Sequence, residues 1–250
     1  MNRLVVILIM VISLTNCFVA KGFSNNALNP QDNDYNIVDH SDWDKLLKKY
    51  VLDNGDVNYK DFKTEVELLN AYINYLSKKN PSDNWSKYEK LAYYINVYNA
   101  NTIKLIFYHY PLKSIKDIKN PWSKKFIRVG EEIFSLSEIE NKILRKMNEP
   151  RIHFAINCAS KSCPKLLNVA FTSKNVDKLL DKATRKFISN PEKNNIKEQR
   201  IQLLKIFQWY KSDFTTNGNQ VDYIKHYSDV NIQQDAKITF LGYDWNLNEH

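Results

Sequence analysis

The segment from Trp85 to Tyr110 constrains the fold more than any other part of the sequence. Its mostly apolar residues recur at steps of three and four, as they do on one face of an α-helix. The recurring positions are Leu91, Tyr94, Ile95, Tyr98, Thr102, Leu105 and Ile106. Pro111 follows directly, and a residue that precedes proline is biased away from the helical conformation. The sequence therefore predicts a long helix that ends at Tyr110.

The composition allows one sizeable core and excludes several kinds of site. The 250 residues are 43% hydrophobic and include 12 Phe, 15 Tyr and 5 Trp, which excludes disorder along the whole length. Only five glycines are present, and the closest two are Gly218 and Gly242. Neither a GxGxxG nor a Walker phosphate loop can exist with this spacing, and we expect no cofactor.

The formal net charge of +8 comes from 36 Lys and Arg against 28 Asp and Glu. The lysines are dispersed among acidic residues, as on solvated helix faces, whereas a nucleic-acid binder gathers them into a stripe with aromatic residues between them. Specific nucleic-acid binding is therefore not expected. The sequence leaves the protein's partners unknown.

The N-terminus has the pattern of an export signal. Arg3 precedes the apolar run Leu4–Leu14, which matches the central region of a signal peptide and is shorter than the ~20 residues of a membrane-spanning helix. Leu14–Cys17 resembles a bacterial lipobox, in which Cys17 would be lipidated, although Asn16 replaces the usual small residue. Cleavage after Gly22 is the alternative. We predict a signal peptide over residues 1–22 and an extracytoplasmic protein, with membrane contact only through that peptide or a lipid anchor.

The rest of the chain predicts a flexible leader over residues 23–39 and a single α+β domain over 40–250, with helices packed around a small β-sheet. Ser41 is the predicted N-cap of the first helix, and Ser137 forms a capping box with Glu140 in a later one. The predicted helices cover residues 42–50, 59–78, 85–110, 137–147, 175–189, 206–213 and 221–227. The predicted strands cover residues 151–157, 201–204 and 237–243. The turn around Gly55 lacks the acidic spacing of an EF-hand.

One predicted strand leads into a loop with two cysteines. Ile152, Phe154 and Ile156 alternate with His153, Ala155 and Asn157, and the loop after them holds Cys158, Ser160 and Cys163. Pro164 is typical of the first position of a helix, so Cys163 is predicted to be its N-cap. Because a helix N-terminus stabilises a thiolate, Cys163 is a candidate nucleophile.

The cysteine pair leaves several alternatives open. A structural Cys158–Cys163 disulfide fits an oxidising compartment, and a catalytic thiolate fits the predicted helix terminus. A free, inert pair is a third alternative. No second pair of ligands follows at metal-binding distance, so no metal site is expected. In an extended strand His153 lies ~16 Å from Cys158, so the base is His153 only if the loop folds back. Otherwise His109 or His226 is an equal candidate.

Two asparagines stand out within the long helix. Asn96 and Asn99 point to neighbouring surface, and a buried amide is costly without partners. One interpretation is that these amides bond backbone groups of a neighbouring loop. The other is that one of them, Asn99 in particular, orients a catalytic base or lines a pocket.

Several of these segments together resemble the domain-of-unknown-function family numbered 547. The resemblance rests on Tyr94–Ala100 (YINVYNA), the SLSEIENKILR segment around Glu140, Arg151–Pro164 (RIHFAINCASKSCP) and Tyr243–Asn248 (YDWNLN). It spans about residues 85–248, and the His-to-Cys-Pro block is its most specific part. The family occurs in exported bacterial proteins and in plant and animal proteins, and it has no established activity. The resemblance directs attention to Asn96, Asn99, His153, Cys158, Cys163 and Asp244.

Two hypotheses for the function follow. In the first, the protein is a thiol-dependent hydrolase or acyl transferase with Cys163 as nucleophile, a histidine as base and Asn99 as orienting residue. In the second, it is a non-catalytic binding or scaffolding module with a structural Cys158–Cys163 disulfide. Under both hypotheses we expect Asn157→Leu to damage the protein.

Overall fold

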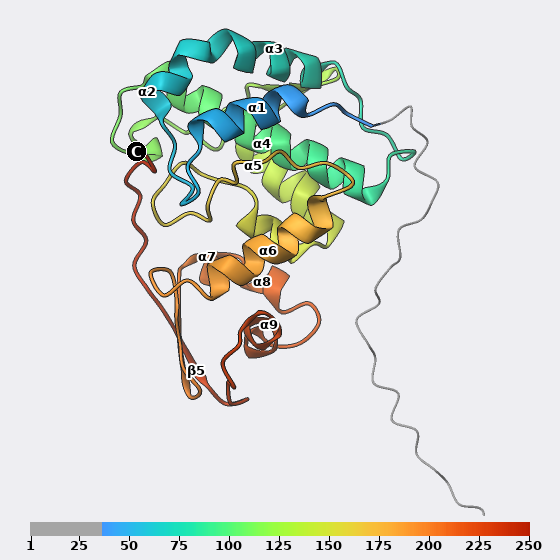
Figure 1. Ribbon diagram of the computed structural model, residues 1–250. Coiled ribbons are helices and arrows are strands. Elements are labelled where there is room, and N and C mark those ends of the chain that lie inside the picture. Colours follow the sequence, from blue (N-terminus) through green and yellow to red (C-terminus); the bar gives the residue numbers. More distant parts are fainter. Residues whose placement is uncertain (1–36) are drawn as a thin grey trace, which may run out of the picture. The chain divides into compact units, whose positions relative to one another are not determined.

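The computed structural model describes residues 37–250 (Figure 1). The predicted signal peptide, Cys17 and nearly all of the predicted leader lie outside the described residues. The described part is α+β, as the sequence predicts, with helices and two small sheets. Within residues 37–250, no helix combines the length and apolar character that a membrane span requires.

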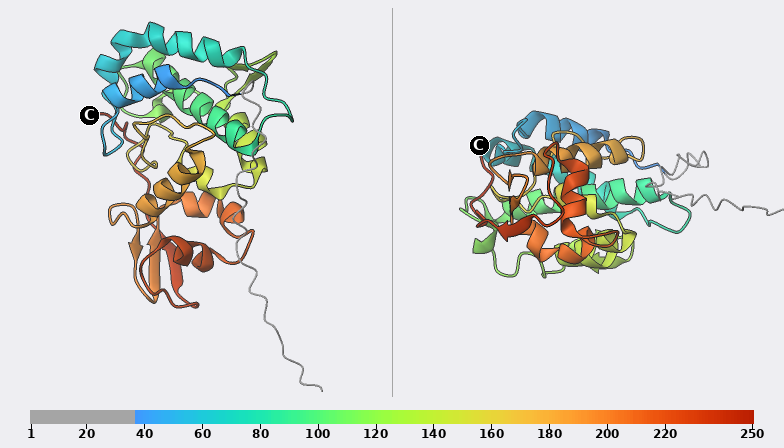
Figure 2. Two further views of the ribbon diagram at one scale, coloured as in Figure 1. Left: turned by 45° about the vertical axis from the view of Figure 1, so that its right-hand side comes forward. Right: turned by 90° about the horizontal axis from the view of Figure 1, so that it is seen from below.

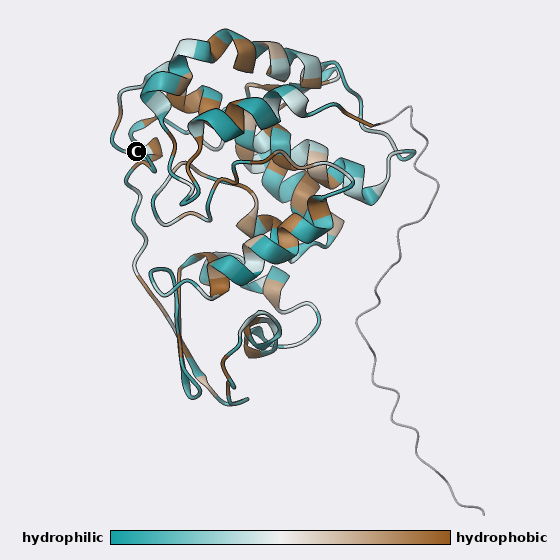
Figure 3. Ribbon diagram, in the orientation of Figure 1, coloured by the Kyte–Doolittle hydropathy of each residue, from teal (hydrophilic) through white to brown (hydrophobic). Residues whose placement is uncertain are grey.

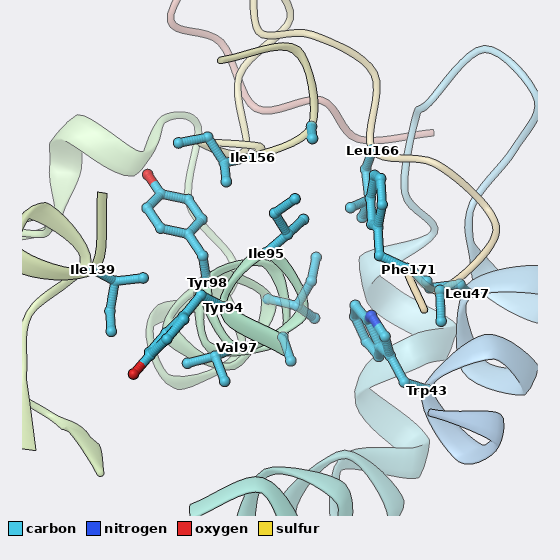
Figure 4. Packing of buried hydrophobic residues seen from close by; sticks show 14 of the residues in the cluster. Trp43, Leu47, Tyr94, Ile95, Val97, Tyr98, Ile139, Ile156, Leu166 and Phe171 are labelled. Carbon is cyan, nitrogen blue, oxygen red and sulfur yellow. The ribbon is translucent and has the colours of Figure 1, made fainter. Parts of the chain in front are cut away.

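Helix α4 (Lys87–His109) lies at the centre of the larger core and confirms the predicted long helix. Every residue from Leu91 to Ile103 is buried, so the helix is covered all round and not on one face only. Figure 4 shows why: Ile139 packs on one side of α4, and Trp43 and Phe171 pack on the other. A helix so completely covered has to satisfy its polar side chains inside the protein.

The helices before α4 cover one of its sides (Figures 1 and 2). They are α1 (Ser41–Tyr50), α2 (Tyr59–Phe62), the 3₁₀ turn η2 (Lys63–Glu65) and α3 (Val66–Ser77). The sequence therefore correctly predicted helical structure over 59–78, but the 3₁₀ turn η2 divides it into two helices. Ser41 is the first residue of α1 and not its cap, because the N-cap position belongs to His40.

The segment after α4 begins with the 3₁₀ turn η3 (Ile115–Asp117) and a hairpin that the sequence did not predict. Its strands β1 (Ile127–Val129) and β2 (Glu132–Phe134) pair antiparallel around Gly130, whose φ of +57° suits glycine. The chain then forms one turn of α-helix, α5 (Leu136–Glu138), followed by a π-helical turn, η4 (Ile139–Ile143), and a 3₁₀ turn, η5 (Leu144–Met147).

The predicted capping box in this segment was wrong. Ser135 is the N-cap of α5, and it forms a reciprocal box with Glu138. Both Ser135–Glu138 and Ser137–Glu140 fit the capping pattern, so the pattern alone does not choose between them. Glu140 is buried, at 6% exposure, and faces the candidate site instead of the solvent.

The predicted strand over 151–157 and the helix after Pro164 were also wrong. Residues Pro150–Phe154 form a 3₁₀ helix, η6, that begins with proline at its first position. Residues 152–157 are all buried, so their apolar and polar alternation does not mark a half-exposed strand. No helix begins at Pro164: the next one is α6 (Val176–Ile188), as predicted for 175–189. Cys163 is therefore not a helix N-cap.

A second core lies between α6 and the C-terminal elements (Figures 1 and 2). It contains the helices α7 (Ile206–Trp209), α8 (Lys211–Phe214) and α9 (Gln220–Tyr227) and a three-stranded sheet. Strand β4 (Arg200–Leu203) pairs antiparallel with β3 (Asn195–Ile196) and parallel with β5 (Lys237–Phe240). The register of the parallel pair places Ile201 opposite Ile238. Two of these strands were predicted, with similar bounds.

The chain returns from β5 to the first core along residues 241–250 (Figure 3). The main-chain N–H of Leu247 donates to Lys113, and that of Val57 donates to Asn248. The N–H of Lys161 donates to Asn246, so this C-terminal segment also contacts the loop with the two cysteines. The segment thus fixes that loop from outside while α4 fixes it from inside.

Because Ser135 and not Ser137 is the N-cap, replacing each of these serines by alanine should have a different effect on stability. Ser135→Ala should lower the free energy of unfolding by about 1 kcal/mol, because it removes the acceptor for the N–H of Glu138. Ser137→Ala, the matched control, should change it by less than about 0.5 kcal/mol, since its hydroxyl accepts only from the Asn141 side chain. Equilibrium urea unfolding measures both. A larger loss for Ser137→Ala would contradict the assigned cap.

Candidate functional site

The loop with the two cysteines is anchored to α4 by one asparagine. The Asn99 amide donates to the carbonyl of Ala155 (2.9 Å) and accepts from the N–H of Asn157 (2.9 Å). Asn99 thus bonds backbone groups of the loop, as the first interpretation of the paired asparagines holds. Its amide is engaged on both sides and makes no hydrogen bond to a histidine.

Asn96 does the same for a different loop. Its amide donates to the carbonyl of Phe171 (2.7 Å) and accepts from the N–H of that residue (3.2 Å). This contact fixes the segment between the cysteines and α6 against α4. Asn96 contributes to the fold there and does not line the cavity described below.

Asn157 closes the cysteine loop on itself. Its side chain donates to the carbonyl of Pro164 (2.7 Å) and accepts from the N–H of Ala159 (2.8 Å), whose φ is +56°. Asp244 holds the outer side of the loop through its backbone: its N–H donates to Ser162 Oγ (2.9 Å), and its carbonyl accepts from the Ser162 N–H. The Asp244 carboxylate accepts from the N–H of Asn246.

This framework brings the two thiols together. Both are free, and their Sγ atoms are 3.0 Å apart. The N–H of Cys158 donates to Cys163 Sγ (3.0 Å). Ser160 Oγ and the Tyr243 hydroxyl lie 3.2 and 3.4 Å from Cys158 Sγ. Cys158 therefore has three hydrogen-bonding neighbours around its sulfur, one of which is the other thiol.

The environments of the two thiols shift their pKa values in opposite directions. Hydrogen bonding from Cys163, with smaller contributions from Ser160 and Tyr243, holds the pKa of Cys158 below its ordinary value although burial acts against this. Burial, and then the hydrogen bond to Cys158, raises the pKa of Cys163 well above its ordinary value. Of the two thiols Cys158 is thus the one that ionises more readily, and the helix-terminus argument for Cys163 does not apply.

His153 lies next to the thiols in the same part of the fold, in a charged network. Its Nε2 atom is 2.8 Å from Asp213 Oδ2 on α8. Arg145 of η5 bonds both oxygens of the same carboxylate, at 2.6 Å each. Tyr210, at the junction of α7 and α8, stacks on the His153 ring with centroids 4.0 Å apart. The imidazole is 1% exposed, so packing fixes its orientation.

The pKa values of the two carboxyl groups in this network shift in opposite directions. Burial alone would raise the pKa of Asp213, but hydrogen bonds from Arg145, His153 and Ser212 outweigh it and hold the pKa well below its usual range. Burial raises the pKa of Glu140, against the opposing effects of Tyr210 and His153. Glu140 Oε1 is 3.9 Å from His153 Nδ1. That nitrogen is buried and has no hydrogen-bond partner among residues 37–250.

The thiols, His153 and Glu140 all line one cavity of about 310 Å³. Its wall is largely aromatic and consists of Tyr98, Trp122, Trp209, Tyr210, Tyr243 and Trp245. Trp209 is 46% exposed and stacks on Trp245 at a centroid distance of 5.8 Å. No lysine or arginine is among the residues that line it. Cys163 also lines a second cavity, of about 260 Å³, together with Lys161 and Lys193.

Of the predicted site residues, the structure gathers Cys158, Cys163 and His153 around the aromatic cavity. It places Asn99, Asn157, Ser160 and Asp244 in the framework of the loop, and Asn96 away from it. Glu140, Arg145, Tyr210, Asp213 and the tryptophans were not predicted as site residues. Arg145 and Glu140 lie in a segment of the family resemblance, which was the available signal. Within residues 37–250, no group of three or more His, Cys, Asp or Glu residues is placed to hold a metal ion.

The Asn157 side chain provides a test of the loop framework. Asn157→Leu leaves the Ala159 N–H and the Pro164 carbonyl buried without partners, so we expect a loss of roughly 2–4 kcal/mol in the free energy of unfolding. Asn168→Leu is the control, because that side chain makes one exposed bond to Asp53 and should change stability by less than about 0.5 kcal/mol. Equilibrium urea unfolding measures the free energy of unfolding of both variants. Equal values for Asn157→Leu and Asn168→Leu would contradict the role of Asn157 in holding the loop.

Comparison with known proteins confirms the family resemblance. Residues 82–188 match the family described as Protein of unknown function, DUF547. This range includes α4, Glu140, Arg145, His153 and both thiols, whereas Asp213 and the C-terminal aromatic residues of the cavity lie beyond it. The other two comparisons found no curated protein and no solved structure that matches the chain.

Proposed function

We propose, from the membership of residues 82–188 in the DUF547 family and from the geometry of the site, that the protein is a thiol-dependent hydrolase or acyl transferase. The sequence analysis suggested Cys163 as the nucleophile, and we propose Cys158 instead. The observation that carries the proposal is the shared cavity: it is lined by Cys158, whose pKa is lowered, and by His153, whose buried Nδ1 has no hydrogen-bond partner among residues 37–250.

Cys158 does not need a base in contact with it. A thiol becomes a nucleophile as the thiolate, which requires either an adjacent base or neighbours that stabilise the charge. Here Cys163, Ser160 and Tyr243 stabilise the charge, and none of the hydrogen bonds of Cys158 involves His153. The imidazole is therefore free for a later step.

His153 is suited to accept a proton from water. Asp213 is ionised, so its oxygen accepts a hydrogen bond and Nε2 of His153 carries the proton. In the neutral ring Nδ1 then has the lone pair, 3.9 Å from Glu140 Oε1. Asp213 holds this tautomer, and Arg145 holds Asp213.

The steps of acyl transfer balance with these groups. The Cys158 thiolate attacks the carbonyl carbon, and the leaving group takes a proton from Glu140, whose pKa burial raises. Water then attacks the thioester and gives a proton to His153 Nδ1, which releases the acid and restores the thiolate. Transfer of that proton from His153 to Glu140 restores both groups. Tyr98, neutral because burial raises its pKa, is the hydroxyl donor on the cavity wall.

A location outside the cytoplasm is part of this proposal and rests on residues 1–22 alone. The apolar run behind Arg3 is the support for export, and Cys17 is the proposed lipid attachment site if the lipobox is used. The alternative function, a non-catalytic binding module, is supported by the aromatic wall of the same cavity.

The lowered pKa of Cys158 predicts its pH profile of alkylation. Because only the thiolate reacts, iodoacetamide should modify Cys158 with a midpoint below the ~8.5 of a free cysteine. Tyr243→Phe should move this midpoint upward, since it removes a stabilising hydroxyl. Peptide mass mapping shows which cysteine is alkylated, so the rate measured is that of Cys158. The matched control is Tyr223→Phe, in the second core. An unchanged midpoint in Tyr243→Phe would remove the support for thiolate stabilisation.

The roles of Cys158 and His153 predict which variant accumulates the intermediate. With p-nitrophenyl acetate, His153→Gln should accumulate one acetyl group on Cys158, because deacylation lacks its base. Wild type should release it faster by about 10²-fold or more. Cys158→Ser should form no such adduct, and circular dichroism checks that each variant folds. Acetyl groups that collect elsewhere, or equal turnover in all variants, would exclude the proposed chemistry.

A further inference from the structure

We infer that Cys158 and Cys163 also form a dithiol that reduces small-molecule disulfides and passes reversibly into a Cys158–Cys163 disulfide. This activity does not rest on the proposed acyl transfer, since it needs neither His153 nor Glu140. It also differs from a structural disulfide, because the bond would form and break in the folded protein.

The spacing of the two sulfurs is the first support. Their 3.0 Å separation has to shrink by only about 1 Å to reach the 2.05 Å of a disulfide bond. The loop that joins them is already closed by Asn157, which bonds Ala159 and Pro164 on either side of the pair. Asn99 fixes the start of this loop to the buried helix α4. Bond formation therefore requires a local movement of two side chains and no refolding.

The second support is the unequal exposure of the two thiols. Both thiols line the aromatic cavity, but Cys158 is partly exposed, whereas Cys163 is only 7% exposed. A disulfide substrate thus meets Cys158 first. Stabilisation of the Cys158 thiolate by Cys163, Ser160 and Tyr243 favours the same order. Cys163, within contact of Cys158, is placed to attack the mixed disulfide that results.

The exchange reaction balances without any further reactant. The Cys158 thiolate attacks one sulfur of RSSR, which breaks that S–S bond, forms Cys158–S–S–R and releases RS⁻. Cys163 loses its proton, attacks Cys158 Sγ and displaces the second RS⁻. Two protein thiols are oxidised and one RSSR is reduced to two RSH. The reverse reaction with excess RSH restores the dithiol.

The second cavity gives the Cys163 proton a separate exit. Cys163 and Lys193 both line this cavity, and none of the described residues that line it is aromatic. Burial lowers the pKa of the Lys193 ammonium, so this amine is a better proton acceptor than an exposed lysine. The resolving thiol can therefore be deprotonated while the substrate fills the aromatic cavity.

The lining of the aromatic cavity selects the substrate class. Its volume of about 310 Å³ admits a small molecule, and Glu140 is the ionisable carboxyl on its wall. Among residues 37–250 no lysine or arginine lines it, and the two cations that contact its wall, Lys116 and Arg145, lie against the rings of Trp245 and Tyr210, so an anionic disulfide finds no cation on the lining itself. We therefore expect neutral or cationic disulfides of low mass to react fastest.

Three disulfides of different charge test this inference on the full chain: hydroxyethyl disulfide, cystamine and glutathione disulfide. Wild type should form the Cys158–Cys163 bond, detected by intact mass and peptide mapping, and excess 2-mercaptoethanol should reverse it without denaturant. The first two probes should react at least ~10-fold faster than the anionic one. A bond that resists reduction in the folded protein would establish a structural disulfide and overturn the inference.

The single-cysteine variants separate the two thiols. Cys163→Ser should stop at a mixed disulfide on Cys158, whereas in Cys158→Ser the remaining thiol should react at least ~10-fold more slowly. Lys193→Met should slow the second step and leave the first unchanged. Equal reaction of both thiols would overturn the assigned order. His153→Gln should still form the Cys158–Cys163 bond although it loses deacylation, so failure of this inference and failure of the proposed acyl transfer are distinguishable.

Discussion

The contacts between buried asparagine amides and loop backbone determine how the rest of the site is built. Helix α4 is covered on all sides. Burying its polar side chains therefore costs free energy unless they form hydrogen bonds with neighbouring groups. Asn99 bonds both a carbonyl and an N–H of the chain that enters the cysteine loop, and Asn96 bonds both groups of Phe171 further along. These bonds give irregular loops the fixed position that β-sheet pairing gives to strands.

A second constraint joins the two cores at the site. Arg145 lies in η5, which contacts α4, whereas Asp213 lies in α8 within the second core. Their two 2.6 Å bonds, with Tyr210 beneath the guanidinium, place a partly buried carboxylate against His153. A paired, partly buried carboxylate that also bonds an imidazole fixes the ring's tautomer as well as its position. The site therefore depends on contact between the cores and cannot be formed by either core alone.

The sequence predicted those features that follow from local periodicity. The helices around Leu91–Ile106 and Val176–Ile188 were found because apolar residues recur at helical spacing over many residues. The predicted strand over 151–157 failed because residues 152–157 are all buried, so their alternation reports no exposed face. The predicted helix after Pro164 failed because the chain has no regular structure from there to α6. The partnership of Arg145, His153 and Asp213 could not be predicted, because tertiary contacts link Asp213 to residues that lie 68 and 60 positions before it.

The cysteine pair shows why correct residues were chosen for a wrong reason. The sequence argument relied on a helix terminus to stabilise a thiolate at Cys163, and no helix begins there. The same stabilisation is instead provided to Cys158 by a thiol and two hydroxyls, one of which comes from Tyr243 in the C-terminal segment. A negative charge shared between two sulfurs in contact settles on the one with more donors, and the other sulfur becomes its donor. The asymmetry of the pair thus follows from the closed loop and the returning C-terminal segment, and it holds whichever reaction the cavity supports.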